Sequence, residues 1–149
     1  MNITHILVAT DLSSEAMSCI PSVADLARSV GARTTLLHVL ESFEAVPHGS
    51  PLAPPLGPAA NAKAMESARA KLEERRTSFG SDIDVSIDLV AGGDPAAEIA
   101  TYAAAHDVDL IAVTTHGRTG VRRLALGSVA EGVIRRTHVP VLVLPLPKE

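Results

Sequence analysis

The stretch that decides the fold is VDLIAVTTHGRTGVRRLALGSVAEGVIRRTHVPVLVL, residues 108–144. It begins with an apolar run at 108–115, continues through a segment rich in glycine and arginine, and ends in a second apolar run at 139–144. Between the two runs lies a helical pattern from about 128 to 137. Two apolar strands joined by a helix predict a parallel pair, because parallel neighbours need a crossover connection and are buried on both faces.

The rest of the chain repeats this alternation of strand and helix patterns. Strand patterns lie at 5–10, 34–40 and 84–90, and helix patterns lie between them at 15–30 and about 60–78. A further helix follows, with Asp94 as N-cap and Pro95 at its first position. Strands that alternate with helices predict a parallel sheet with helices on both faces. We therefore expect a single α/β domain over residues 1–149, built on a doubly wound sheet of five strands.

The two ends of the predicted sheet differ in character. Residues 84–90, DVSIDLV, alternate strictly between polar and apolar, so this strand is expected at an edge with one wet face. The last strand is apolar throughout, which is a liability if it is also an edge and nothing covers it. We predict that a second copy of the chain covers it, through pairing of the two strands Val139–Leu144 across a two-fold axis.

Three smaller features complete the survey of the elements. Residues 42–60 hold five of the ten prolines and predict a long loop. The helix after it is expected to bury one stripe, formed by Met65, Ala68, Leu72 and Phe79. Cys19, the sole cysteine, is expected to be a packed thiol.

The composition argues against several classes of function. A formal net charge of −4, with one Tyr, two Phe and no Trp, argues against a nucleic-acid partner and against a stacked flavin. A single cysteine and scattered histidines form no metal-ligand spacing. The sequence contains no G-x-S-x-G elbow, which argues against an acyl-transfer enzyme. With no signal-peptide pattern and no apolar run of the ~20 residues that a membrane span needs, we expect a cytoplasmic protein.

The glycine-rich segment is a candidate phosphate site. Residues 114–117 follow the carboxyl end of a strand, where open α/β sheets bind ligands. Ser128 and Glu131 form a capping-box pattern at the start of the next helix, and helix N-termini attract anions. From the spacing alone, a plain turn followed by the start of a helix explains this segment as well as a phosphate site does. Walker A and G-x-G-x-x-G patterns are absent from the sequence.

A family resemblance covers essentially the whole chain outside the proline-rich loop. The segment THGRTGVRRLALGSVAEGVIRRTHVPVLVL resembles the C-terminal signature of the universal stress protein family. The opening HILVATDLSSEA, the central LLHV and the segment GDPAAEIATYAAAHDVDLIAV are similar to the same family. The resemblance implies a Rossmann-like, adenine nucleotide alpha hydrolase-like fold with strand order 3-2-1-4-5.

The family's ATP-binding members carry the pattern G-x2-G-x9-G-[ST], and this chain matches all of it but one position. The matching residues are Gly117, Gly127 and Ser128, whereas Thr114 stands at the first glycine position. Thr114 adds a side chain where the backbone of the family's ATP binders approaches the nucleotide, and this departure weakens the inference of ATP binding. The phosphate end of the pattern is intact.

The resemblance implies a role for each residue of the site. Asp11 would face the ribose, the backbone of Val39 would read the adenine edge, and Thr115 would line the ribose. Gly117, Gly127 and Ser128 would hold the phosphates, with His116 and Val129 alongside. The predicted nucleotide-binding set is Thr10, Asp11, Val39, Thr114, Thr115, His116, Gly117, Gly127, Ser128 and Val129.

Structural explanations compete with these roles. Asp11 could begin a turn and cap the first helix, Val39 could be core, and Ser128 could be a helix cap. His116 could be an ordinary loop histidine, and Arg122 and Arg123 a solvated face. Arg135 and Arg136 suit the last turn of a helix through its dipole.

Two functions follow from the resemblance and the residues. The first is a regulatory module that binds ATP with Mg²⁺ and acts in the stress response as a homodimer with regulatory partners. No residue is clearly placed to orient an attacking water, so we expect at most a slow ATPase and no catalytic residues. The second is a nucleotide-independent interaction module of the same fold, which Thr114 favours.

Overall fold

The computed structural model describes residues 1–41, 58–115 and 126–146. The expected loop at 42–60 ends earlier than predicted, because a helix begins at Pro58, and residues 42–57 lie outside the described part. The elements along the chain are β1 His5–Ala9, α1 Ser14–Met17, α2 Ile20–Val30, β2 Arg33–Glu41, α3 Pro58–Arg76, the 3-10 turn η1 Thr77–Phe79, β3 Val85–Gly92, α4 Pro95–Ala105, β4 Leu110–Thr114, α5 Ser128–Arg136 and β5 Val141–Leu144.

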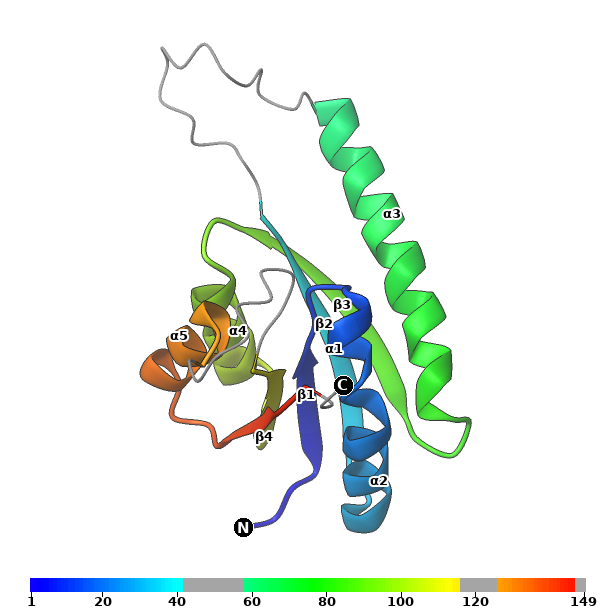
Figure 1. Ribbon diagram of the computed structural model, residues 1–149, viewed down its shortest axis with the longest axis vertical. Coiled ribbons are helices and arrows are strands. Elements are labelled where there is room, and N and C mark those ends of the chain that lie inside the picture. Colours follow the sequence, from blue (N-terminus) through cyan, green and yellow to red (C-terminus); the bar gives the residue numbers. More distant parts are fainter. Residues whose placement is uncertain (42–57, 116–125, 147–149) are drawn as a thin grey trace.

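The five strands form one parallel sheet in the order β3-β2-β1-β4-β5, as expected. Helices α1, α2 and α3 cover one face and α4 and α5 cover the other (Figure 1). The predicted edge position of β3 is confirmed, and β5 forms the opposite edge. All four residues of β5 are half-buried, so its apolar side chains are partly accessible at this edge.

Two layers of apolar side chains hold the helices on the sheet. On the first face, α2 and α3 pack Val23, Ala27 and Leu72 against Ile6 and Leu36 of the central strands. On the second face, α4 and α5 contribute a separate cluster, which contains Ile99, Ala130, Val133, Leu7 and Ile111. The central strands are therefore buried on both sides, as their continuous apolar sequences predict.

Two helices differ from their expected form. The helix expected at 15–30 is split into α1 and α2, because Pro21 lacks the N–H that would donate to the carbonyl of Met17. The stripe expected on α3 is buried at Ala68 and Leu72, but Met65 is 37% exposed. Phe79, also buried, belongs to the 3-10 turn that follows the helix.

Several local predictions are confirmed. Asp94 caps α4 by accepting a hydrogen bond from the Ala96 N–H at 3.1 Å. The Cys19 thiol is buried and donates to the Ala16 carbonyl at 2.9 Å, and burial raises the pKa of Cys19 to about 11. Arg135 and Arg136 lie in the last turn of α5. No helix in the described ranges is both long and apolar enough to span a bilayer.

Candidate functional site

The candidate site lies where the carboxyl ends of β1 and β4 meet. From β1 the chain first adds β2 on one side and later β4 on the other, so the strand order reverses at this point. Ligands of open α/β sheets bind outside the strand ends at such a reversal. Thr10 and Asp11 follow the end of β1, and Thr114 ends β4, so the structure brings these three predicted residues to the same end of neighbouring strands, where such a crevice is expected.

Val39 presents its main chain to this crevice. The Thr10 N–H donates to the Leu37 carbonyl at 2.9 Å, so the main-chain groups of Leu37 point toward β1. Those of Val39 point the same way, because alternate residues of a strand face the same neighbour. The ladder with β1 ends at Ala9 and Leu37, although β3 continues beside β2 to Gly92. Since the Val39 side chain is buried, its main chain is the part that a ligand could reach.

The start of α5 is seated directly on the end of β4. The Gly127 N–H donates to the Thr115 carbonyl at 2.6 Å, and the Thr115 N–H donates to the Leu144 carbonyl at 3.0 Å. Thr114 is paired in register with Leu144 and is half-buried. The sheet therefore fixes the position of the helix N-terminus next to the crevice.

The capping box expected at Ser128 is wrong. Gly127 is the N-cap, in an extended conformation, and its carbonyl accepts the Glu131 N–H at 2.9 Å. Ser128 is already the first helical residue. The Glu131 carboxylate forms an ion pair with Arg135, whose Nη2 lies 2.7 Å from Oε1 of Glu131. Within the described residues no side chain caps this helix, so the amides of its first turn keep their capacity for an anion. Ser128 and Val129 are exposed there.

Asp11 organises the turn that follows β1. Its Oδ1 accepts hydrogen bonds from the Ser13 N–H at 2.9 Å and from the Ser13 hydroxyl at 2.5 Å. Ser13 is the residue that caps α1, through a bond from the Ala16 N–H at 3.1 Å. Asp11 therefore supports the cap without being the cap, and it combines the structural role with a place in the crevice.

Two residues that support this turn were missed by the sequence reasoning. His38 donates from Nδ1 to the Thr10 carbonyl at 2.8 Å, and its position next to Val39 in the LLHV segment was an available signal. Arg75 donates from Nη2 to the Leu12 carbonyl at 2.5 Å. These residues lie 63 positions apart, and no sequence pattern links them.

Part of the predicted set lies outside the described residues. His116 and Gly117 are in this part, as are Arg122 and Arg123. The described site therefore consists of the strand ends, the main chain of Val39 and the start of α5. In the described ranges, no group of three or more His, Cys, Asp or Glu side chains is arranged to hold a metal ion.

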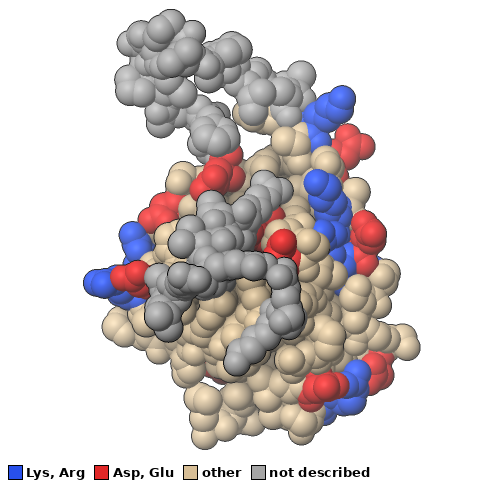
Figure 2. Space-filling model, viewed as in Figure 1, with Lys and Arg blue, Asp and Glu red and all other residues tan. Residues whose placement is uncertain are grey.

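The remaining surface offers paired charges. On the face shown in Figure 2, Lys and Arg lie next to Asp and Glu. The ion pairs include Arg28 with Asp82 at 2.5 Å and Arg76 with Glu73 at 2.9 Å. The hydrogen bond from Arg28 holds the pKa of Asp82 below its ordinary value. A shallow hollow of about 300 Å³ lies at the opposite end of the sheet and is lined by both Arg28 and Asp82. The charge of Arg28 in this hollow is therefore already paired with a carboxylate.

Comparisons with known proteins agree with this architecture. Residues 2–145 match the model of the universal stress protein family. Universal stress protein MJ0577 of Methanocaldococcus jannaschii is 35% identical over 83 residues, which are 55% of this chain and 51% of that protein. Its solved structure, described as a structure-based assignment of biochemical function, covers 100% of both chains with a TM-score of 0.82 at 27% identity.

Two more distant structures share the fold. A universal stress protein in complex with cAMP has a TM-score of 0.67 at 20% identity and covers 97% of this chain and 98% of its own. The Archaeoglobus fulgidus universal stress protein in complex with dAMP has a TM-score of 0.63 at 23% identity and covers 96% and 98%. In sequence, the chain matches only 34% of the length of universal stress protein MJ0531 of Methanocaldococcus jannaschii and 51% of the length of universal stress protein MJ0577. Since the family model covers nearly all of its length, the chain belongs to the universal stress protein family.

Proposed function

We propose that this protein is a regulatory module that binds an adenine nucleotide, ATP with Mg²⁺, in the crevice at the ends of β1 and β4. One observation carries the proposal. The first turn of α5 has no side-chain cap among the described residues, and the hydrogen bond from Gly127 to Thr115 holds it against the strand end. Main-chain amides and the helix dipole at this position suit a phosphate group.

The adenine end of the ligand has separate support. The main-chain N–H and C=O of Val39 point to the β1 side of β2, beyond the last residue that pairs with β1. A donor and an acceptor at this position suit the hydrogen-bonding edge of a base. Relatives of the same fold have been solved with cAMP and with dAMP, so the adenine ring is the natural choice of base. Asp11 follows β1, the strand between β2 and β4, and the family resemblance assigns its carboxylate to the ribose.

The preference for ATP rests on the match of Gly117, Gly127 and Ser128 to the family's ATP-binding pattern. Mg²⁺ would enter with the nucleotide, because phosphate oxygens and water commonly supply most of its ligands. The output is a change of conformation or association, with at most slow hydrolysis. We retain the expectation of a cytoplasmic location and of regulatory protein partners.

The active form is proposed to be a homodimer through β5. The Ile111 N–H donates to the Pro140 carbonyl at 2.9 Å, and the Thr115 N–H donates to that of Leu144. Even-numbered residues of β5 therefore face β4, and the main-chain groups of Val141 and Val143 face outward. A second β5 could pair with this outward side and cover the apolar edge.

The first test is to purify the protein under native conditions, denature it and identify any released nucleotide by chromatography and mass. We expect ATP or ADP at near-stoichiometric yield, with loss of the nucleotide in G127V. Gly93→Val is the matched control, because Gly93 has open space around it and follows β3, the edge strand that β2 and β1 separate from β4. Empty protein that gains no thermal stability from Mg·ATP contradicts the proposal.

A second variant separates phosphate binding from helix capping. Since Ser128 does not cap α5, S128A should leave stability within about 0.5 kcal/mol, whereas loss of a true cap costs about 1 kcal/mol. Its affinity for Mg·ATP should fall by about tenfold, as expected for the loss of a hydrogen bond to a charged group. Destabilisation with unchanged affinity would return Ser128 to a structural role.

Thr114 supports a second candidate, the nucleotide-independent interaction module. Its half-buried side chain ends β4 at the position where the family pattern has glycine. If the protein is empty, T114G distinguishes the two functions. Gain of Mg·ATP binding in this variant would identify the threonine side chain as the block and would favour the interaction module for the natural chain.

A further inference from the structure

The turn between β1 and α1 has a strained backbone at Leu12. This residue has φ 65°, in the left-handed region, although leucine carries a Cβ that disfavours it. Its side chain is buried in the core under α2 and α3. Such a conformation persists when its surroundings hold it, and it is often found at binding sites. The contacts that hold Leu12 therefore bear on the crevice next to it.

Hydrogen bonds within the turn supply part of the support. The Leu12 N–H donates to the Thr10 hydroxyl at 3.0 Å, and Asp11 accepts two bonds from Ser13. Support from outside the turn reaches the peptide before Asp11 and the peptide after Leu12. His38 of β2 bonds the Thr10 carbonyl, and Arg75 of α3 bonds the Leu12 carbonyl at 2.5 Å. Asp11 thus lies between two anchored carbonyls.

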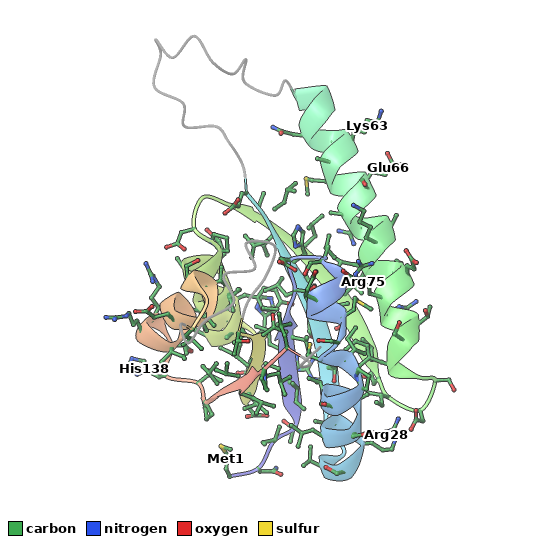
Figure 3. The ribbon with its side chains drawn as sticks, viewed as in Figure 1. Met1, Arg28, Lys63, Glu66, Arg75 and His138 are labelled. Carbon is green, nitrogen blue, oxygen red and sulfur yellow. The ribbon has the colours of Figure 1, made fainter. Side chains whose placement is uncertain are left out.

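We propose that Arg75 is a positioning residue of the nucleotide site, which holds the strained Leu12 peptide and thereby fixes the direction of Asp11. The inference rests on the proposed function. Figure 3 shows Arg75 on the side of α3 that faces α1. Its Nε is buried and meets no acceptor in the described part of the chain, so the Leu12 carbonyl is the contact that the structure gives this guanidinium.

The neighbouring arginine shows why this contact is distinctive. Arg76 lies one position further along α3 and forms an exposed pair with Glu73 within its own helix. Such a pair contributes little to stability or geometry. Arg75 instead forms a partly buried, charge-assisted bond to a carbonyl of another element, and bonds of this kind are short and strong. Its loss leaves the Leu12 carbonyl without its hydrogen bond to α3, although the Leu12 side chain still packs in the core.

Relaxation of Leu12 would reduce the share of molecules in which Asp11 is ready to bind. The apparent dissociation constant rises as that share falls, with no change in the contacts made by the bound state. Arg75 acts through Asp11 in this account. Its effect on affinity must therefore disappear when the carboxylate is absent.

The test is a double-mutant cycle with Mg·ATP as the probe, measured by titration calorimetry well below the melting temperature. We expect R75M to weaken binding about tenfold, as for the loss of one charged hydrogen bond, and R76M to bind within twofold of the natural chain. In the D11A background, R75M should weaken binding no further. Non-additivity of this kind identifies coupled residues, whereas a general structural role of Arg75 gives additive effects.

The outcomes separate this inference from the proposed function. If the natural chain binds Mg·ATP but R75M binds equally well, or if the effects of R75M and D11A add, the positioning role is overturned and the nucleotide site stands. If the natural chain binds no adenine nucleotide, both are overturned. Should R75M fail to fold, R75Q enters the same cycle with the same expectations, because its shorter, uncharged side chain cannot restore the bond.

Discussion

Gly132 of α5 lies directly against Ala96 of α4, so closely that a Cβ built on Gly132 would be 2.6 Å from the Cβ of Ala96. The two helices are also joined at their ends by the pair between Arg136 and Asp94 at 3.0 Å. The glycine therefore sets the distance between α4 and α5. It also sets the place of the α5 N-terminus at the candidate site.

Replacement of Gly132 by alanine is expected to destabilise the protein by about 1–2 kcal/mol. Alanine improves helix propensity by up to about 1 kcal/mol, but overpacking costs about 1–3 kcal/mol, and here the clash involves a helix rather than a flexible side-chain end. Chemical denaturation measures the difference. The double variant A96G/G132A should show a favourable coupling, because it restores room at the contact. Additive losses would mean that the helices simply move apart.

A second stability prediction concerns the end of α2. Gly31 closes this helix with φ 69°, and the Ala32 N–H donates to the Ala27 carbonyl at 3.0 Å. No heavy atom lies within 4 Å of a Cβ built on Gly31, so Gly31→Ala introduces backbone strain alone. We expect a loss of about 1 kcal/mol in the free energy of unfolding.

Gly93→Ala is the matched control for this prediction. Gly93 has equally open surroundings, and its φ is outside the left-handed region. Its substitution should be neutral or stabilising by less than about 1 kcal/mol, because alanine restricts the unfolded chain. Equal effects at the two glycines would show that backbone strain does not decide the outcome at Gly31.

The pH dependence of stability should report the buried His5. Nδ1 of its ring donates to the His106 carbonyl at 3.0 Å, and Nε2 lies 2.8 Å from the Thr35 hydroxyl. Burial, helped by the charge of Arg33, lowers the pKa of His5 below its ordinary value of 6.5, although hydrogen bonds with the His106 and Asp107 backbone and the charge of Asp109 partly oppose the shift. Below pH 6.5 the unfolded chain therefore binds a proton that the folded chain does not.

Stability should fall as the pH drops below 6.5, by up to about 1.4 kcal/mol per pH unit, and should level off below the folded pKa of His5. Unfolding by denaturant between pH 5 and 8 measures this slope, and H5Q should flatten it. Hydrogen bonds from Thr4 lower the pKa of Asp109, but that carboxyl acts at and below its ordinary value of 3.8, outside this window. An unchanged slope in H5Q would assign the effect to other groups.

Sequence patterns predicted most of the fold. Strands that are buried on both faces have continuous apolar sequences, and helices that pack on a sheet have apolar residues with a period of about 3.6. The edge position of β3 followed from its alternation, and Asp94 followed from its place before Pro95. The split between α1 and α2 was missed although Pro21 signalled it. The predicted capping box at Ser128 was wrong because the preceding glycine takes the N-cap position through its main chain alone.

The candidate site divides in the same way. The topology rule located Thr114 at the end of β4, whereas Thr10, Asp11 and Val39 entered the predicted site through the family resemblance. The availability of the Val39 main chain to a ligand depends on where the ladder between β1 and β2 stops, and no local pattern encodes that point. The bond between Arg75 and Leu12 depends on packing of a distant helix, so its prediction requires the three-dimensional structure.

The dimer through β5 is tested at Val143, whose N–H points away from β4. Val143→Pro removes an outward donor and keeps the ladder to β4, because proline is tolerated on the open side of an edge strand. We expect a folded monomer by analytical sedimentation, and a monomer again when Val141 and Val143 are both replaced by lysine. Pro placed at Leu142 is the contrasting variant, since the main chain of Leu142 faces β4 and its change should destabilise the fold itself. A dimer that persists in both Val143→Pro and the lysine variant places the contact between copies on another surface.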